Sequence, residues 1–128
     1  MIFVDTSVWI TAFRASGSAE ATHLTALLDT DAVALTIVTK LELQIGAIGR
    51  NRPSLRRVLS ALPAYVPSDA CWPTLDDWTD AAARAGERFG VADLLVGAIA
   101  AENEGEIWSL DRDFARMETL GFVTTHRA

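Results

Sequence analysis

The sequence predicts an α/β fold: one domain with a mostly parallel five-stranded sheet and helices on both faces. Short apolar segments, of the length of buried strands, alternate with longer segments whose apolar residues recur at helical spacing. Such alternation is typical of β-α-β units, whose right-handed crossovers build a parallel sheet. With 128 residues, half of them hydrophobic, the chain suits a single domain with its own core. We expect this domain to span residues 1–128.

The first half of the chain is predicted to hold three short strands and four helices. The first strand ends at Asp5, and the third lies between Pro63 and Pro67, as an edge strand can. Ser18 suits the N-cap of a helix, and Pro53 suits a first helical turn. The strands are expected at residues 1–5, 32–35 and 63–67, and the helices at 6–13, from 18 onward, at 36–48 and at 54–62.

The second half of the chain is predicted to hold three helical segments and two strands. Its first helix is long, with an acid-rich start that suits the helix dipole, and Gly90 ends it. The next helix is almost entirely apolar, so we expect it to lie at the centre of the fold. The helices are expected at residues 74–89, 93–104 and 111–120, the last a short turn, and the strands at 106–110 and 121–124.

The composition limits the classes of protein to which the chain can belong. Its 17 acidic and 11 basic side chains give a net charge of −6, whereas a general nucleic-acid-coating protein needs a basic face. The single cysteine, Cys71, excludes an internal disulfide and a zinc cluster of thiolates. The longest apolar run, residues 94–101, is too short to span a bilayer, and the N-terminus does not resemble a signal peptide. We therefore expect a cytoplasmic protein.

Two predicted strands end in the same way, with an acid and a hydroxyl. The first ends at Asp5 beside Thr6, and the fourth leads through Ser109 to Asp111. Because ligand sites in open α/β sheets form at the carboxyl ends of the strands, both acids are expected at one edge of the sheet. A simple N-cap on the following helix is the alternative for Asp5.

Two further acids, Glu42 and Asp93, occur at helical positions where the neighbouring residues give no local reason for a carboxylate. Glu42 has no basic residue three or four positions away, so the local ion pair typical of a helical Glu is missing. Asp93 opens the most apolar helix, although a buried carboxylate is costly to desolvate. The alternatives are a solvated Glu42 at the edge of an apolar face and a capping role for Asp93.

Four carboxylates in apolar surroundings need a cation if they are to stay ionised together. Oxygen ligands without His or Cys select hard ions, so the sequence favours Mg²⁺ or Mn²⁺. Two such ions, with a charge of +4, would bring the net charge from −6 to −2. That change removes much of the charge objection to a polyanionic substrate.

Four motifs in this order resemble those of the PIN-domain ribonucleases, in particular the VapC-like toxins of type II toxin–antitoxin systems. The resemblance covers essentially the whole chain, and each motif alone is weak. The motifs are VDTSV at residues 4–8, TKLEL at 39–43, DLLVGAIA at 93–100 and SLDRDF at 109–114.

The resemblance implies a quartet of catalytic, metal-binding acids, supported by neighbouring hydroxyls and one further acid. It implies hydrolysis of RNA phosphodiesters with one or two Mg²⁺ or Mn²⁺ ions, a small antitoxin partner and a homodimer. The Asp111/Asp113 pair leaves open which acid faces the metal; we expect Asp111, with Asp113 as an outer acid or a cap paired to Arg116. The quartet is Asp5, Glu42, Asp93 and Asp111, and the supporting residues are Thr6, Ser109 and Asp113.

Four arginines after the Glu42 helix are candidates for phosphate contacts with RNA, namely Arg50, Arg52, Arg56 and Arg57. A solvated turn explains that cluster equally well. We expect Trp9 and Trp108 to be structural, and His23 and His126 have no partners nearby in the sequence.

Other functional classes fit the sequence less well. A receiver-like phosphoacceptor domain needs adjacent acids after its first strand, and a haloacid-dehalogenase-like phosphatase needs a second Asp at the position of Ser7. A non-catalytic PIN-like module that binds a metal or a partner is the remaining alternative.

Overall fold

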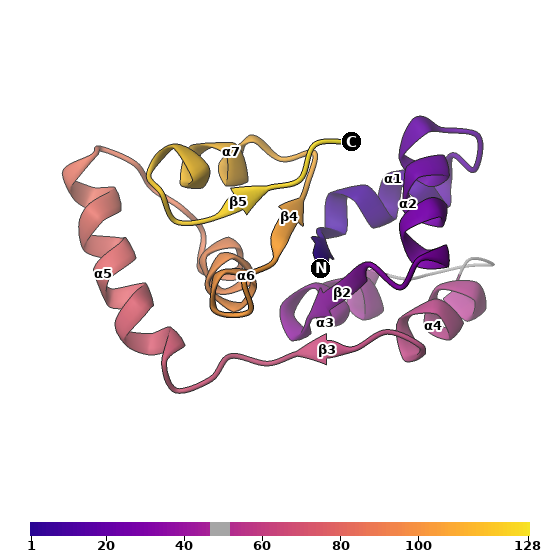
Figure 1. Cartoon of the computed structure of the whole chain (residues 1–128), viewed down its shortest axis with the longest axis horizontal. Helices are drawn as coiled ribbons and strands as arrows, with labels where there is room; N and C mark the ends of the chain where they lie inside the picture. Colours follow the sequence, from indigo (N-terminus) through magenta and orange to yellow (C-terminus); the bar gives the residue numbers. More distant parts are fainter. Residues whose placement is uncertain (47–51) are drawn as a thin grey trace.

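The computed structural model describes residues 1–46 and 52–128, which form seven helices and five strands (Figure 1). In chain order the elements are β1 (Ile2–Val4), α1 (Thr6–Arg14), α2 (Ala19–Asp29), β2 (Val33–Thr36), α3 (Ile37–Gly46), α4 (Arg52–Ser60), β3 (Ala64–Tyr65), α5 (Cys71–Arg84), α6 (Val91–Glu102), β4 (Glu106–Trp108), α7 (Arg112–Thr119) and β5 (Thr124–Thr125).

The five strands form one sheet in the order β3-β2-β1-β4-β5, and all four of its strand pairs are parallel. This confirms the predicted α/β class and the edge position of β3. The first strand lies at the centre, where Phe3 pairs with Ala34 of β2 and with Ile107 of β4. The carboxyl ends of β1 and β4 therefore lie side by side.

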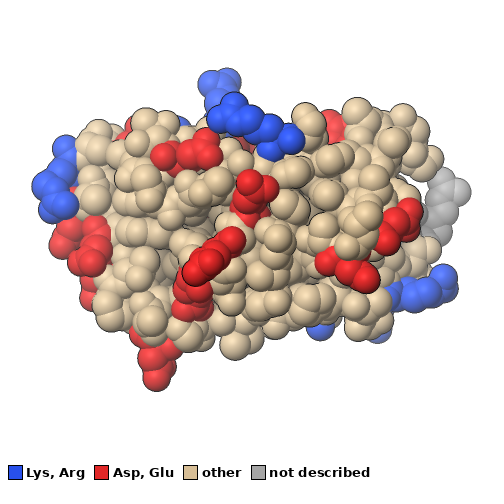
Figure 2. Space-filling model, viewed as in Figure 1, with Lys and Arg blue, Asp and Glu red and all other residues tan. Residues whose placement is uncertain are grey.

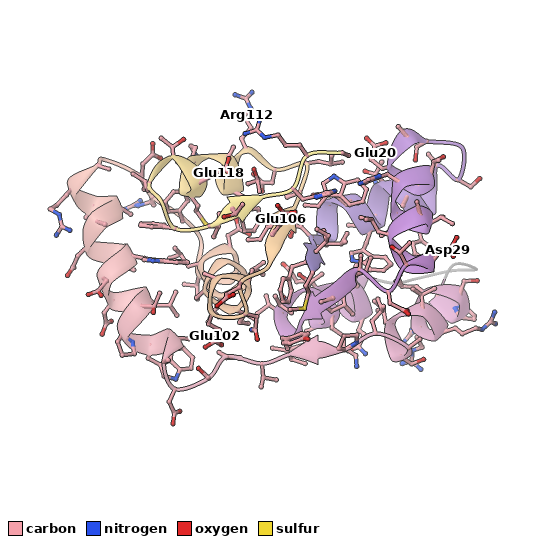
Figure 3. All side chains as sticks on the ribbon, viewed as in Figure 1. Glu20, Asp29, Glu102, Glu106, Arg112 and Glu118 are labelled. Atoms are coloured by element: carbon pink, nitrogen blue, oxygen red, sulfur yellow. The ribbon has the colours of Figure 1, made fainter. Side chains whose placement is uncertain are left out.

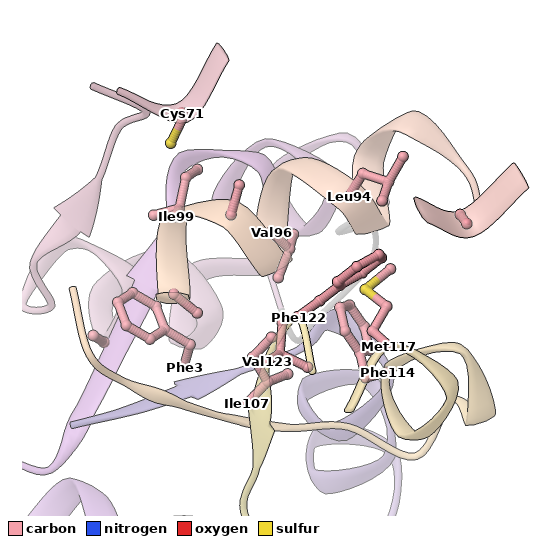
Figure 4. Close-up of a cluster of buried hydrophobic side chains, with 14 residues drawn as sticks. Phe3, Cys71, Leu94, Val96, Ile99, Ile107, Phe114, Met117, Phe122 and Val123 are labelled. Carbon is pink, nitrogen blue, oxygen red and sulfur yellow. The ribbon is translucent and has the colours of Figure 1, made fainter. Parts of the chain in front are cut away.

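Helices cover both faces of the sheet, as predicted, and each face has its own apolar core. Successive side chains of a strand point to opposite faces, so Phe3 packs into one core while Ile2 and Val4 pack into the other. Figure 4 shows the Phe3 core, to which α5, α6 and α7 contribute. The helices α1, α2, α3 and α4 contribute to the second core.

The apolar helix α6 is central, as its sequence predicts. Six of its twelve residues are buried, including Val96 and Ile99. The predicted structural roles of two tryptophans are also confirmed, because Trp9 and Trp108 are almost fully buried. The indole nitrogen of Trp9 donates a hydrogen bond of 3.1 Å to the carbonyl of Val4.

The helix predicted at residues 74–89 begins and ends earlier than expected. It starts at Cys71 because Pro73 is tolerated in a first turn, where its missing N–H has no helical partner anyway. It ends at Arg84 because Gly86, at φ +71°, takes the left-handed conformation. The amide of Glu87 then donates to the carbonyl of Ala82, which closes a Schellman cap.

The strand predicted at residues 121–124 is also displaced. Gly121, at φ +81°, caps α7 in the same manner, and the amide of Phe122 donates to the carbonyl of Met117. Pairing with β4 therefore begins only at Thr124. The helix predicted at 36–48 is described as far as Gly46, and its last two residues lie outside the described part. In the described ranges, no helix is both long and apolar enough to cross a membrane.

Candidate metal centre at the sheet edge

The ends of β1 and β4 bring the first and fourth sequence motifs together. The ladder continues past the strands, because the amide of Asp5 donates a 2.9 Å hydrogen bond to the carbonyl of Trp108. Asp5 and Ser109 thus leave adjacent strands at the same edge. This is the expected position for a site in a parallel sheet.

Asp5 is a buried carboxylate held in place by hydroxyl groups, with only 7% of its surface exposed. Its Oδ2 accepts hydrogen bonds from Ser109 Oγ at 2.8 Å and from Ser7 Oγ at 2.9 Å. Oδ2 also accepts from the amide of Ser7, which makes Asp5 the N-cap of α1. These bonds all end on Oδ2. Among the described residues none donates a side-chain or capping hydrogen bond to Oδ1, so this oxygen is available to a ligand. Asp5 is thus an N-cap, as the alternative interpretation of the sequence held, but capping uses only one of its two carboxylate oxygens.

Three further carboxylates meet where two helices begin. Asp93 lies in the first turn of α6, Asp111 is the N-cap of α7, and Asp113 lies in the first turn of α7. One oxygen from each carboxylate falls within 4.8 Å of the others. Helix N-termini favour negative charge, so the fold gathers these acids with electrostatic support from both helices.

Burial and the neighbouring acids together raise the pKa of Asp93 to about 7. Burial is the largest cause, because it penalises the charged carboxylate. Asp113 adds to the shift as a hydrogen-bond partner of the protonated form, and the negative charges of Asp5 and Asp111 contribute further. In the absence of a cation, the cluster therefore holds a proton near neutral pH.

Arg116 provides part of the missing positive charge, as expected from its pairing with Asp113. Its guanidinium donates a 2.5 Å hydrogen bond to Asp113 and forms an ion pair with Glu87. It also lies over the ring of Phe89, 4.7 Å from its centroid. Glu87 and Phe89 belong to the loop between α5 and α6, so Arg116 connects Asp113 to that loop. Its positive charge is paired directly with only one carboxylate of the cluster, Asp113.

Glu42 lies outside the group of three carboxylates. It is exposed on α3, and its Oε1 accepts a 2.8 Å hydrogen bond from Thr6 Oγ1 at the start of α1. The structure therefore joins Glu42 to Thr6, and both residues belong to the site that the sequence predicts. Because Thr6 directly follows Asp5, this hydrogen bond links Glu42 to the end of β1.

The cluster has the donor set of a hard divalent ion. Its ligand atoms are carboxylate oxygens only, and their number exceeds what Arg116 can neutralise. Mg²⁺ and Mn²⁺ prefer such oxygens. A bound ion would take the place of the proton held by Asp93. The residues present therefore fit the Mg²⁺ or Mn²⁺ ion that the sequence predicts.

One residue of the site is absent from the sequence-based set. Ser7 Oγ donates to Asp5, lies 3.2 Å from Ser109 Oγ, and accepts a 3.0 Å hydrogen bond from the amide of Leu110. It therefore joins the two strand ends. Its position beside Asp5 and Thr6 in the first motif was the signal that could have identified it.

The arginine cluster proposed for RNA contacts is only partly described. Arg52, Arg56 and Arg57 lie exposed on α4, and none forms an ion pair with another described residue. Arg50 lies outside the described residues.

A family model for the PIN domain matches residues 2–120. Ribonuclease VapC11 of Mycobacterium tuberculosis and VapC ribonuclease Mb1587 of Mycobacterium bovis are each 33% identical over 119 residues, which is 89% of this chain and 89% of each relative. These matches confirm the resemblance carried by the four motifs.

Solved structures share the fold. VapBC2 from Rickettsia felis, bound to a DNA fragment from its promoter, superposes with a TM-score of 0.79 at 17% identity over 98% of both chains. VapBC-5 of M. tuberculosis, from a family of toxin-antitoxin systems, gives 0.69 at 26% identity over 99% of this chain and 98% of that one. The chain therefore belongs to the PIN-domain family, among its VapC proteins.

Proposed function

We propose that the protein is an endoribonuclease that depends on Mg²⁺ or Mn²⁺ and acts as the toxin of a toxin–antitoxin pair. The observation that supports this most strongly is the convergence of Asp93, Asp111 and Asp113 beside Asp5 at the edge of the sheet. The VapC ribonucleases that it resembles support the choice of RNA as substrate.

In this proposal, Asp93 and Asp111 hold the ion together with Asp113, and Asp5, whose charge is close to Asp93, offers its Oδ1. Glu42 completes the set, or orients a water, from the position that Thr6 gives it. A bound divalent ion would supply Lewis-acid stabilisation for the negative charge that develops on the phosphate. A second ion remains compatible with this number of carboxylates.

The chain's own residues supply positioning and a proton acceptor. Ser7 and Ser109 fix Asp5 in one orientation, and Arg116 fixes Asp113. Asp93 gives up its proton when the ion binds, so the acceptor for the proton of the attacking water has to be another carboxylate. Glu42, which lies outside the three clustered carboxylates, is the candidate for that role.

A pocket of about 210 Å³ opens beside Asp111 and offers room for part of a nucleotide. Its lining includes Ser109, Asp111, His126 and Arg127. The exposed arginines of α4 are further candidates for contacts with phosphates. On the face drawn in Figure 2, acidic side chains are spread between basic ones near its rim, and the described residues of that face form no continuous basic surface.

The test is cleavage of structured RNA by the purified protein with Mg²⁺, compared with EDTA. Asp93→Asn and Asp5→Asn should lower the rate by more than about 100-fold, since even the partners of metal ligands are worth about 10- to 100-fold. Asp77→Asn, an exposed acid on α5, is the matched control and should cut normally. Equal cutting by all four proteins would refute the nuclease and favour a non-catalytic module. If the wild type cuts and the two site variants do not, mapping of cellular RNA 5′ ends after brief expression would identify the substrate.

The antitoxin and the homodimer are part of the same proposal. An apolar pocket of about 320 Å³ between α1, α2 and α4 offers a surface for a partner helix. The solved neighbours are described as VapBC and toxin–antitoxin complexes, which supports such a partner. Co-expression with a candidate antitoxin should yield a stable complex on size exclusion, and the free chain should elute as a dimer. The pocket's residues include Ala12, Ala21, Leu24, Leu28 and Val58.

A further inference from the structure

The two histidines of the chain meet although 103 positions separate them in sequence. His23 lies on α2, and His126 directly follows β5. Their Nε2 atoms are 2.9 Å apart, and their rings are nearly parallel, with 11° between the planes. Both rings are half-buried and pack edge-on against Trp108, with centroids 4.8 Å and 6.0 Å from it. This is a defined arrangement of two imidazoles.

A carboxylate determines which nitrogen of His126 is free. Nδ1 of His126 lies 3.1 Å from Oε1 of Glu106. An ionised carboxylate only accepts hydrogen bonds, so Nδ1 carries the proton. The neutral ring then presents the lone pair of its Nε2 to His23. A ligating histidine in a metal site is held in the same way, with its second nitrogen donating to a carboxylate.

We propose that His23 and His126 bind a divalent transition ion of the zinc type at their facing Nε2 atoms, in place of the proton between them. Zinc–nitrogen bonds of about 2.0–2.1 Å in a tetrahedral site separate two nitrogens by about 3.3 Å. The present 2.9 Å separation has to widen by a few tenths of an ångström. Each ring also has to turn so that both lone pairs point to one ion, because the centroids are 5.2 Å apart and the two Nε2 atoms therefore face each other head-on. Water molecules fill the other coordination positions.

The chemistry of the ligands separates this site from the acidic cluster. Imidazole nitrogen suits Zn²⁺, Ni²⁺ and Cu²⁺, whereas carboxylate oxygen suits Mg²⁺ and Mn²⁺. An excess of Mg²⁺ therefore occupies the oxygens of Asp93 and Asp111 without displacing a zinc-type ion from the histidines. The two sites can be tested independently.

The ion would fasten the C-terminal segment to α2. At present that segment is held by Glu106, through His126, and by Glu118, which accepts hydrogen bonds from Thr125 and Arg127. Figure 3 labels both glutamates, and Figure 1 draws the C-terminus close to α1 and α2. A bond from His126 to His23 connects two ends of the fold that the sheet alone does not join.

The experiment uses the full chain without a polyhistidine tag, because a tag would bind the same ions. Zn²⁺ is titrated by calorimetry in excess Mg²⁺, with thermal unfolding measured in parallel. Wild type should bind one equivalent and unfold at a higher temperature with Zn²⁺, and His23→Gln and His126→Gln should lose both effects. Glu106→Gln should bind about 10- to 100-fold more weakly, and Asp93→Asn should bind as wild type does.

A measurement on the wild type alone guards against variants that fail to fold. Zinc-edge X-ray absorption of the loaded protein should show two imidazole nitrogens in the coordination shell. An oxygen-only shell, an absence of Zn²⁺ binding, or binding that survives in folded His23→Gln would each overturn the proposal. None of these outcomes depends on RNA cleavage, so the histidine site and the nuclease can fail separately.

Discussion

Ser109 donates a hydrogen bond of 2.8 Å from its hydroxyl to the buried carboxylate of Asp5, and so connects the ends of two adjacent strands. The contact joins residues 104 positions apart in sequence. Its energetic value follows from the charge of its acceptor, because a hydrogen bond to a charged group is worth about 1.5–3 kcal/mol.

Replacing Ser109 by Ala should therefore lower both stability and RNA cleavage. Asp5 retains its bonds from Ser7, so we expect a loss near the lower end of the range, about 1.5 kcal/mol in the free energy of unfolding. Urea denaturation measures it. Ser109→Thr keeps the hydroxyl and is the matched control; a Ser109→Ala protein as stable as the Thr variant would contradict the prediction.

The stability of the metal-free protein should fall as the pH rises from about 4 to about 7. The pKa of Asp93 is about 7 in the folded chain, against an ordinary value of 3.8 for an aspartate in water. Between these values the folded state binds the proton more tightly than the unfolded state does. The stabilising effect is therefore present at low pH and lost as Asp93 ionises. Urea midpoints in EDTA across this range measure the slope.

Asp93→Asn gives a direct check of that slope. The amide cannot ionise, so the variant should be more stable than wild type above about pH 7 in EDTA. Mg²⁺ should reverse the order, because it stabilises only the chain that keeps the carboxylate. A variant with the same pH slope as wild type would show that another group is responsible.

Arg116→Gln should lower the unfolding temperature at neutral pH, and it should lower it more in the metal-free protein than in the Mg²⁺-loaded protein. The variant removes the cation that pairs with Asp113 and Glu87, and a bound ion would compensate for part of the lost positive charge. Thermal unfolding with and without Mg²⁺ measures the difference. Arg112→Gln changes an exposed residue of the same helix, labelled in Figure 3, and should have little effect in either condition. Equal losses with and without Mg²⁺ would argue against a link between Arg116 and the ion.

Gly105→Ala should be strongly destabilising. A Cβ at this position would lie 2.5 Å from the ring of Phe3, in the core beneath β1. Overpacking of this kind costs about 1–3 kcal/mol. Gly17→Ala is the control, since a Cβ there meets no atom within 4 Å. Chemical denaturation should show a lower midpoint for the first variant and a near-unchanged one for the second.

The sequence predicted the layers of the fold well, because apolar periodicity reports directly on burial. It predicted the proximity of Asp5 and Asp111 from the strand pattern: both acids follow parallel strands, whose carboxyl ends share an edge. The errors lie at Gly86 and Gly121. A left-handed glycine, Gly86, ended the helix predicted at 74–89 early, and a second one, Gly121, delayed the start of the strand predicted at 121–124.

Contacts between distant side chains were beyond the reach of local patterns. Nothing near His23 in sequence indicates that His126 lies 2.9 Å away. The membership of Asp113 in the carboxylate group is similar, since a residue two positions after an N-cap has a local explanation in the cap itself. Roles set by tertiary packing become visible only in three dimensions.

The central position of β1 has a consequence for how the protein is made. The strand β4, which pairs with β1, follows it about a hundred residues later in the chain, and α7 follows later still. A prematurely terminated polypeptide that ends before residue 106 carries Asp5 and Glu42 and lacks Asp111 and Asp113. Synthesis must therefore pass the start of α7 before the acids of the metal centre can gather, so translation products that stop earlier cannot assemble it.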